Sequence, residues 1–233
     1  VEFAGGGVQD YDIPVAIGRR VDHVLFAEGK TPYAILLGND ASDSERWAAD
    51  ELSNALKAIS GSDVPVKKVG EHPVEHAILL GTTPQVMKIL GESAIGFKDA
   101  DEGFQYENVD STIIIRGGKQ RGTMYGVMDF LERELGCRWY TPGVTKLPTR
   151  DRFTFDYLSR KDSPGIRVRN DFYHEAFNPI WAAHNRVNGA MGYREQPGDV
   201  EAYWAVHTFN QFMPPSEFFA THPEYFSLVN GKR

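Results

Sequence analysis

The run from Arg121 to Gly143 constrains the fold of this chain more than any other stretch. Its apolar residues recur at intervals of three and four, the spacing of one face of a helix: Met124, Val127, Met128, Leu131 and Leu135. An apolar strand-like run at residues 112–115 precedes this helix, and a second at residues 137–140 follows it. The order strand, helix, strand predicts a sheet with a helix packed on it.

The residues before this run repeat the same alternation. Residues 33–37 and 76–80 are predicted strands, each closed by a glycine, and residues 84–90 are a predicted helix. Residues 42–45, Ser-Asp-Ser-Glu, have the spacing of a capping box that begins a helix ending at Gly61. Residues 103–107 pair with 112–115 as a hairpin, and residues 152–155 form a last strand. The predicted fold class is therefore α/β, a mixed sheet with helices mainly on one face.

Composition narrows the class of protein. Of the 233 residues, 25 are basic and 32 acidic, with no block of like charge, so we expect no nucleic-acid partner. No apolar run reaches the roughly 18 residues of a membrane span. The one cysteine, Cys137, excludes a disulfide framework within the chain and a thiolate metal site, and its apolar setting predicts a buried structural thiol. The chain begins at Val1, and a removed signal peptide is expected.

Two domains are predicted, residues 1–158 and 159–233. Residues 159–165 are polar and close with Pro-Gly, which is typical of a linker. Residues 161–233 carry 13 of the 28 aromatic residues and four of the seven histidines. In this second part, residues 166–172 alternate at the strand period, residues 179–187 and 215–220 are predicted helices, and residues 202–209 are a second strand. One such unit cannot bury its own faces, so we expect residues 160–233 to pack on the first domain, to pair with another copy, or to be poorly ordered.

Several motifs allow two interpretations. Gly117-Gly118-Lys119 lacks the spacing of a phosphate-binding loop and favours a tight turn. Four histidines with Asp171 and Glu175 lack any short metal-ligand spacing, so no metal and no cofactor are predicted. Asp171 and Glu175 resemble a pair of catalytic carboxylates, although ion pairing with a neighbouring arginine is favoured.

The candidate binding residues follow from position. If the second part begins a barrel of alternating strands and helices, side chains at the carboxyl ends of its strands face the site. Planar polar groups and aromatic faces, which suit sugars, gather there. The predicted substrate-binding residues are Arg167, Arg169, Asp171, His174, Trp181, Asn185, Arg186 and His207, while Trp181 can equally belong to a core between the two parts.

Three stretches, residues 42–61, 121–143 and 222–233, together resemble a bacterial family catalogued as domain of unknown function 4838. That family is similar to glycoside hydrolase family 163, which includes endo-acting N-acetylglucosaminidases on N-glycans. The first 155 or so residues resemble the non-catalytic α/β domain that precedes the (β/α)8 barrel in family 20 hexosaminidases and family 67 α-glucuronidases.

The resemblance implies the N-terminal portion of a glycoside hydrolase, in which residues 159–233 begin a (β/α)8 catalytic barrel and the catalytic carboxylates lie on later strands. No catalytic residue is therefore assigned, and Arg167 or Arg169 matches the family 20 arginine that contacts the sugar. The implied partner is a glycan or polysaccharide, with self-association through the incomplete barrel edge, and the implied location is periplasmic or extracellular. The alternative is a stand-alone carbohydrate-binding or interaction module.

Overall fold

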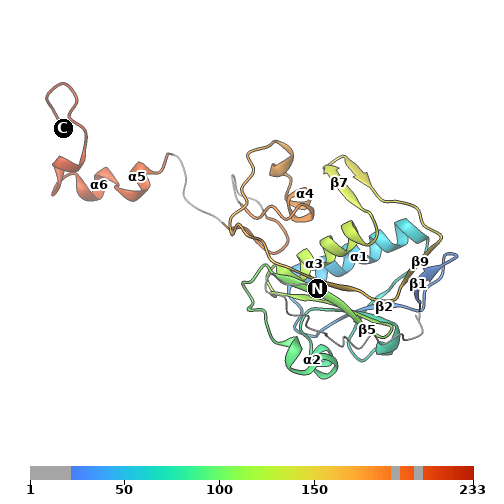
Figure 1. The fold of residues 1–233 in the computed structure, drawn as a ribbon. Coiled ribbons are helices and arrows are strands. Elements are labelled where there is room, and N and C mark those ends of the chain that lie inside the picture. The colour runs from blue at the N-terminus through green and yellow to red at the C-terminus, as the bar shows by residue number, and fades with distance from the viewer. Residues whose placement is uncertain (1–21, 190–194, 202–206) are drawn as a thin grey trace, which may run out of the picture.

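A six-stranded sheet forms the centre of the protein (Figure 1). The computed structural model describes residues 22–189, 195–201 and 207–233. The sheet runs in the order β10-β5-β6-β4-β2-β3, with bounds β10 (Ser159–Asp162), β5 (Phe104–Val109), β6 (Thr112–Gly117), β4 (Ala77–Leu80), β2 (Ala34–Leu37) and β3 (Val66–Lys68). Strands β3, β2, β4 and β6 are parallel, whereas β5 and β10 are antiparallel to their neighbours. The predicted mixed sheet is confirmed.

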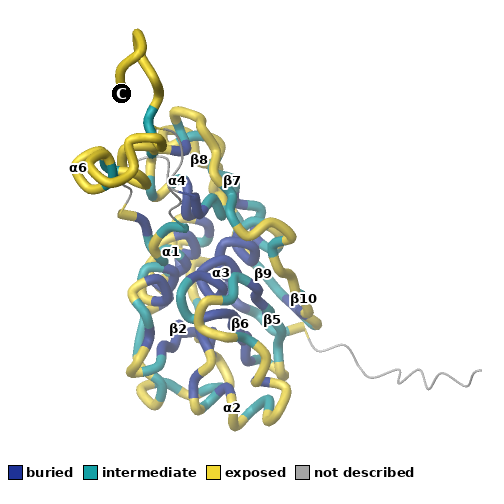
Figure 2. Tube along the Cα trace, turned by 90° about the vertical axis from the view of Figure 1, so that its left-hand side faces the viewer, coloured by how far each residue is buried: buried dark blue, intermediate teal, exposed yellow. Residues whose placement is uncertain are grey.

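Helices cover both faces of this sheet, unequally. The long helices α1 (Asp43–Ser60) and α3 (Gly122–Arg133) pack on one face and build the larger core. The short α2 (Pro84–Leu90) and the 3-10 turn η2 (Gly91–Ala94) cover the other face with a smaller apolar cluster. Figure 2 shows the buried residues concentrated where α1 and α3 meet the strands. The prediction of helices mainly on one face holds for the two long helices, α1 and α3. The short helix α2 lies on the opposite face.

Local sequence signals fix the helix ends as expected. The Ser42 side chain accepts from the Glu45 amide, and the Glu45 carboxylate accepts from the Ser42 amide, so the capping box is complete. Helix α1 ends at Gly61, whose φ of 72° lies in the left-handed region that favours glycine. The apolar stripe of α3 is fully buried, together with Tyr125 and Phe130. Burial raises the pKa of the Cys137 thiol to about 11, in keeping with a structural role.

The turn after β6 is tight, as predicted. A Cβ on Gly117 would collide with the backbone of Gly122 and Gly103, and one on Gly118 would collide with the backbone of Asp101. Glycine is required here because three backbone segments approach one another closely.

Two small sheets flank the central one. Strand β1 (His23–Ala27) pairs antiparallel with β9 (Arg152–Phe155), and β7 (Arg138–Thr141) pairs antiparallel with β8 (Val144–Lys146). The predicted strands at 137–140 and 152–155 therefore exist, but neither joins the central sheet.

The predicted linker is partly wrong. Residues Ser159–Asp162 are β10, which pairs with β5 at the edge of the central sheet, and Arg160 is bonded to Asp129 of α3 at 3.2 Å. An exposed polar stretch can serve as an edge strand because only one of its sides needs partners. We call residues 23–162 the sheet domain.

The predicted strand at residues 166–172 is wrong, because this stretch has no strand ladder. The η3 turn (Glu175–Phe177) and α4 (Pro179–His184) follow, so the predicted helix at 179–187 ends three residues early. Residues 202–206 of the second predicted strand lie outside the described residues, and Phe209 begins a helix instead. The elements that follow are α5 (Phe209–Phe212), α6 (Pro215–Phe218) and η4 (Pro223–Tyr225), and a further 3-10 turn, η1 (Val74–His76), precedes β4.

We expect a chain ending at Asp162 to unfold in one cooperative transition, since the sheet domain contains every residue of both cores except Ala183. A chain ending at Leu158 should be about 1 kcal/mol less stable, because it loses the β10–β5 ladder and the Arg160–Asp129 ion pair. Urea unfolding of the two chains measures this difference. A broad, non-cooperative transition of the longer chain would show that the sheet domain does not fold independently.

Candidate functional site

Residues 163–189 and 195–201, here called the docked segment, lie against the ends of β5 and α3. Within it, three short stretches converge on Asn188, which is fully buried. Its Oδ1 accepts from the amide of Arg169 at 2.7 Å, and its carbonyl accepts from the amide of Glu201 at 2.7 Å. The amide of Gly189 donates to the carbonyl of Arg169 at 2.9 Å, and a Cβ on Gly189 would collide with Asn170. Asn188 thus organises the segment internally.

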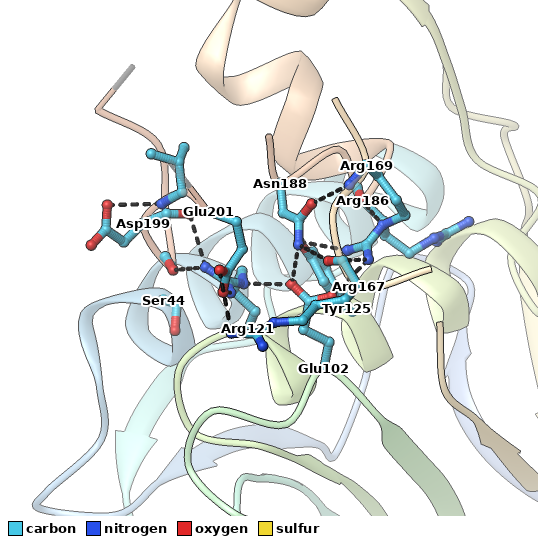
Figure 3. Close-up of polar contacts among 12 residues, drawn as sticks. Ser44, Glu102, Arg121, Tyr125, Arg167, Arg169, Arg186, Asn188, Asp199 and Glu201 are labelled. Carbon is cyan, nitrogen blue, oxygen red and sulfur yellow. Dashed lines mark hydrogen bonds and ion pairs between the residues drawn. The ribbon is translucent and has the colours of Figure 1, made fainter. Parts of the chain in front are cut away.

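A chain of alternating charges joins the docked segment to the sheet domain (Figure 3). Arg121 Nε lies 2.6 Å from Glu102 Oε1, and Arg121 Nη2 lies 2.7 Å from Glu201 Oε1. Arg169 Nη1 lies 2.7 Å from Glu102 Oε2, and Arg167 Nη2 lies 3.7 Å from Glu201 Oε2. Asn188 Nδ2 also donates to Glu102 Oε1 at 2.6 Å. The two carboxylates therefore connect three arginines across the interface.

Arg121 is the centre of this network, with a side chain only 1% exposed. It stands at the N-cap of α3, and its Nη1 donates to the carbonyls of Gly198 and Asp199 at 3.1 and 3.3 Å. Gly198 has a φ of 80°, and a Cβ there would collide with Arg121 Cγ. A buried charge is tolerated only when its donors are paired, and here each guanidinium nitrogen has a partner.

Arg169 contacts Tyr125 of α3 and the backbone of the docked segment, in addition to Glu102. Its guanidinium lies 5.7 Å from the ring centroid of Tyr125, and its Nε donates to the carbonyl of Arg186 at 2.7 Å. Burial, followed by the charge of Glu102, raises the pKa of Tyr125 to about 12, so its hydroxyl stays protonated at neutral pH. Arg169 therefore acts as a fixed structural cation.

Beside this network lies a hollow of about 490 Å³. Its walls come from both the sheet domain and the docked segment: Ala100, Asp101, Glu102, Arg121, Ser163, Pro164, Gly165, Arg167 and Glu201. The side chain of Arg167 is 79% exposed, in contrast to the other two arginines. Arg167 can consequently offer donors to a ligand while Glu201 offers an acceptor.

A second contact between the two parts is aromatic. His184 of α4 stacks on Trp139 of β7, with ring centroids 4.5 Å apart and an angle of 8° between the planes. Trp47 of α1 lies 5.4 Å from the same imidazole, and His184 Nε2 lies 2.8 Å from Glu51 Oε2. Trp181 Nε1 donates to the Trp139 carbonyl at 3.1 Å. This aromatic contact fixes α4 on the sheet domain.

The predicted binding residues fall into three groups. Arg167 and Arg169 belong to the charge network, and Arg186 donates to Glu132 of α3 at 2.6 Å. Trp181 and Asn185 both donate to the carbonyl of Trp139, at 3.1 and 3.2 Å. Asp171, His174 and His207 are exposed. The structure thus pairs the donors of Arg169 within the protein, whereas Arg167 remains exposed.

Glu102, Arg121, Asn188 and Glu201 were absent from the sequence-based candidates. One signal was present at Arg121: helix N-caps favour Ser, Thr, Asp or Asn, and a cation opposes the helix dipole at that end. A buried arginine at this position therefore requires acidic partners, but the sequence does not reveal which carboxylates supply them.

Within the described residues, no three histidine, cysteine, aspartate or glutamate side chains are grouped so that they could hold a metal ion. In the same part of the chain, no helix combines the length and apolarity needed to cross a membrane.

The fold is that of an α/β domain with a mixed sheet, to which a further segment is docked. Residues 139–233 match the model of the family described as "Domain of unknown function (DUF4838)", which confirms the resemblance over this part of the chain. The match begins in β7, inside the sheet domain, and runs through the docked segment. No curated protein matches the chain.

Among solved structures, the chain is similar to a family GH115 4-O-methyl-α-glucuronidase with specificity for decorated arabinogalactans. That match has 18% identity, a TM-score of 0.49, and covers 64% of this chain and 19% of the other. A Streptomyces plicatus β-hexosaminidase in complex with GlcNAc gives 17% identity, a TM-score of 0.40, and 64% and 24% coverage. A GH20 β-N-acetylhexosaminidase from Streptomyces coelicolor A3(2) has 19% identity and a TM-score of 0.40, and the match covers 64% of this chain and 24% of the other. The chain spans about a fifth to a quarter of these proteins, and such distant likenesses carry no functional conclusion.

Proposed function

We propose that this chain is the N-terminal portion of a glycoside hydrolase that acts on glycans or polysaccharides. In this proposal the sheet domain is an accessory domain, and the residues after Asp162 begin the catalytic domain. The observation that carries the proposal is the hollow between the sheet domain and the docked segment, whose two walls the ion pairs of Arg121 with Glu102 and Glu201 join. The match of residues 139–233 to one family model supports the continuity of these two parts.

The hollow beside the network supports sugar as the ligand class. Exposed Arg167 supplies hydrogen-bond donors and Glu201 an acceptor, and hydroxyl groups can use both. Pockets between two structural units are common sites for small ligands. Of the predicted binding residues, we keep Arg167 as the principal contact with the sugar. Asp171, His174 and His207 are exposed and remain further candidates for binding it.

Residues 207–233, here called the tail, support the presence of further protein surface around them. In Figure 1, α5 and α6 lie apart from the central sheet, and none of the described tail residues is buried. Phe209 is 88% exposed, and Phe212 and Leu228 are more than half exposed. Large apolar side chains gain roughly 1.5–3 kcal/mol each on burial, so an exposed set of this kind favours a covering partner. A later part of the catalytic domain fits this role, and self-association is the other expectation.

We expect the 233-residue chain to hydrolyse neither aryl N-acetyl-β-glucosaminides, aryl glucuronides nor N-glycans, and the complete product of its gene to hydrolyse one of these classes. Glycosidic cleavage needs an acid and a base or nucleophile on opposite sides of the bond, and in this proposal both lie on later strands of the catalytic domain. In the complete product, Arg167→Ala should raise KM about tenfold with a smaller change in kcat, since it removes a charged hydrogen bond to the substrate.

Matched controls separate the outcomes. Arg152→Ala changes an exposed arginine of β9 and should leave KM unchanged. Turnover by the 233-residue chain would contradict the assignment of catalysis to later residues. A complete product that binds glycans without cleaving them would support a carbohydrate-binding module instead. Because glycans of these classes lie outside the cytoplasm, we also propose a periplasmic or extracellular location.

A further inference from the structure

In the central sheet, the helices that follow two neighbouring parallel strands lie on opposite faces of the sheet. Strands β2 and β4 lie side by side and are parallel, with Leu37 paired to Leu80 at their carboxyl ends. After β2 the chain enters α1, which packs on the face of the larger core, whereas after β4 it enters α2 on the other face (Figure 1). In open α/β sheets, such a divergence leaves a crevice at the strand ends where ligands bind.

A cavity of about 260 Å³ occupies this position. It is lined by residues at or after the carboxyl ends of β2, β4 and β6 and by the loop before β5: Gly38, Asp40, Ala41, Glu45, Leu80, Gly81, Thr82, Thr83, Phe97, Asp99, Gly117 and Lys119. Gly81 has a φ of 79°, and a Cβ there would collide with Glu45 Oε1. Glycine at this position therefore lets the Glu45 carboxylate reach the end of β4.

Contacts among its walls hold the cavity in shape. Lys119 Nζ lies 2.6 Å from Asp40 Oδ2, so an ion pair connects the loops after β2 and β6. The Lys119 carbonyl accepts from the hydroxyls of Ser42 and Ser44 at 2.7 and 3.2 Å. Glu45 accepts from the Ser42 amide at 2.8 Å and from the Thr123 hydroxyl at 3.2 Å. The polar groups are thus positioned before any ligand arrives, which lowers the entropic cost of binding.

The charges of the lining define the ligand class. Asp40, Glu45 and Asp99 are hydrogen-bond acceptors, and Lys119 is the single cation among the lining residues. An anionic ligand would meet three carboxylates and one lysine that is already paired, so its binding is unfavourable. The volume lies below the usual range for drug-sized ligands, about 300–1,000 Å³. A compact molecule rich in hydroxyl groups suits both the size and the acceptors.

We propose that this cavity, here called the switch-point cavity, binds an uncharged polyhydroxylated ligand of about one sugar ring. The hydroxyl groups donate to Asp99 and Glu45, and Lys119 donates to a ligand oxygen while it keeps its contact with Asp40. This site belongs to the sheet domain alone and does not depend on hydrolysis elsewhere in the protein.

The test is a titration of the 233-residue chain, labelled with ¹⁵N, with N-acetylglucosamine, xylose and myo-inositol, followed by amide chemical shifts. We expect saturable shifts at Gly81, Thr82 and Lys119 with at least one probe, and a dissociation constant on the order of 1 mM for so small a ligand. Lys119→Met and Asp99→Asn should each weaken this binding by about tenfold, because each removes one charged hydrogen-bonding group.

Lys57→Met is the matched control. Lys57 makes one surface ion pair with an aspartate, Asp63 at 3.1 Å, as Lys119 does with Asp40, but it does not line the cavity. It should leave the dissociation constant unchanged. Absence of saturable shifts with all three neutral probes, equal weakening by both lysine variants, or stronger binding of glucuronate or inorganic phosphate would each overturn the proposal. These outcomes are distinct from the failure of the proposed hydrolase function, since no readout depends on turnover.

Discussion

Replacement of Arg121 by methionine is expected to lower the free energy of unfolding by about 3–5 kcal/mol, because removal of one partner leaves buried charges uncompensated. The side chain is 1% exposed and contacts Glu102, Glu201 and the carbonyls of Gly198 and Asp199. Methionine fills similar space but donates no hydrogen bond. Urea unfolding monitored by tryptophan fluorescence measures the loss.

Two further variants test whether pairing geometry, and not charge alone, causes this effect. Arg121→Lys keeps the charge but cannot reproduce the fork of donors, so we expect an intermediate loss of about 2 kcal/mol. Arg133→Met removes another arginine of α3, whose side chain is 56% exposed and pairs with Asp129 four residues earlier, and should cost less than about 0.5 kcal/mol. Equal losses for Arg121→Met and Arg133→Met would exclude the buried network as the source of stability.

Amide hydrogen exchange locates the effect. The docked segment should lose protection at residues 186–189 and 198–201 in Arg121→Met, while the central strands β4 and β6 keep theirs. Loss of protection throughout the sheet domain would show that Arg121 stabilises the sheet itself and does not specifically hold the docked segment.

The parts of the fold that sequence predicted are those set by local patterns. The capping box at Ser42, the C-cap at Gly61 and the α3 stripe each depend on residues within a few positions of one another. The hairpin of β5 and β6 was found for the same reason, because its two strands are separated by a short turn.

The elements that were predicted wrongly depend on partners far away in the sequence. Residues 166–172 alternate apolar and polar side chains, yet the backbone of Arg169 is bonded to Asn188 and Gly189 in place of a strand ladder. Ser159–Asp162 have the composition of a linker, but β5 offers an open edge with which they pair. The site shows the same limit. Arg167 and Arg169 were identified from the sequence, whereas Arg121, Glu102 and Asn188 were not; Glu102 Oε1 and Asn188 Nδ2 lie 2.6 Å apart although the two residues are 86 positions apart in the sequence.

The second large effect on stability is expected at the aromatic contact around His184. We expect His184→Ala to lower the free energy of unfolding by about 2–3 kcal/mol, since it removes a buried ring and leaves a gap between two tryptophans. The imidazole stacks on Trp139, lies beside Trp47 and reaches Glu51 at 2.8 Å. Differential scanning calorimetry and protease digestion should show a lower Tm and earlier cleavage near α4.

Two further substitutions of histidines test whether stacking causes this loss of stability. His184→Gln can still reach Glu51 with its amide but cannot stack, so it should recover less than half of the loss if stacking dominates. His174→Ala changes an exposed histidine ten residues earlier and should leave Tm and the cleavage pattern unchanged. If His184→Ala is cleaved no faster than His174→Ala, the stacked ring does not hold α4 in place. In that case the hydrogen bonds from Trp181 and Asn185 to the Trp139 carbonyl, together with the charge network, fix the docked segment.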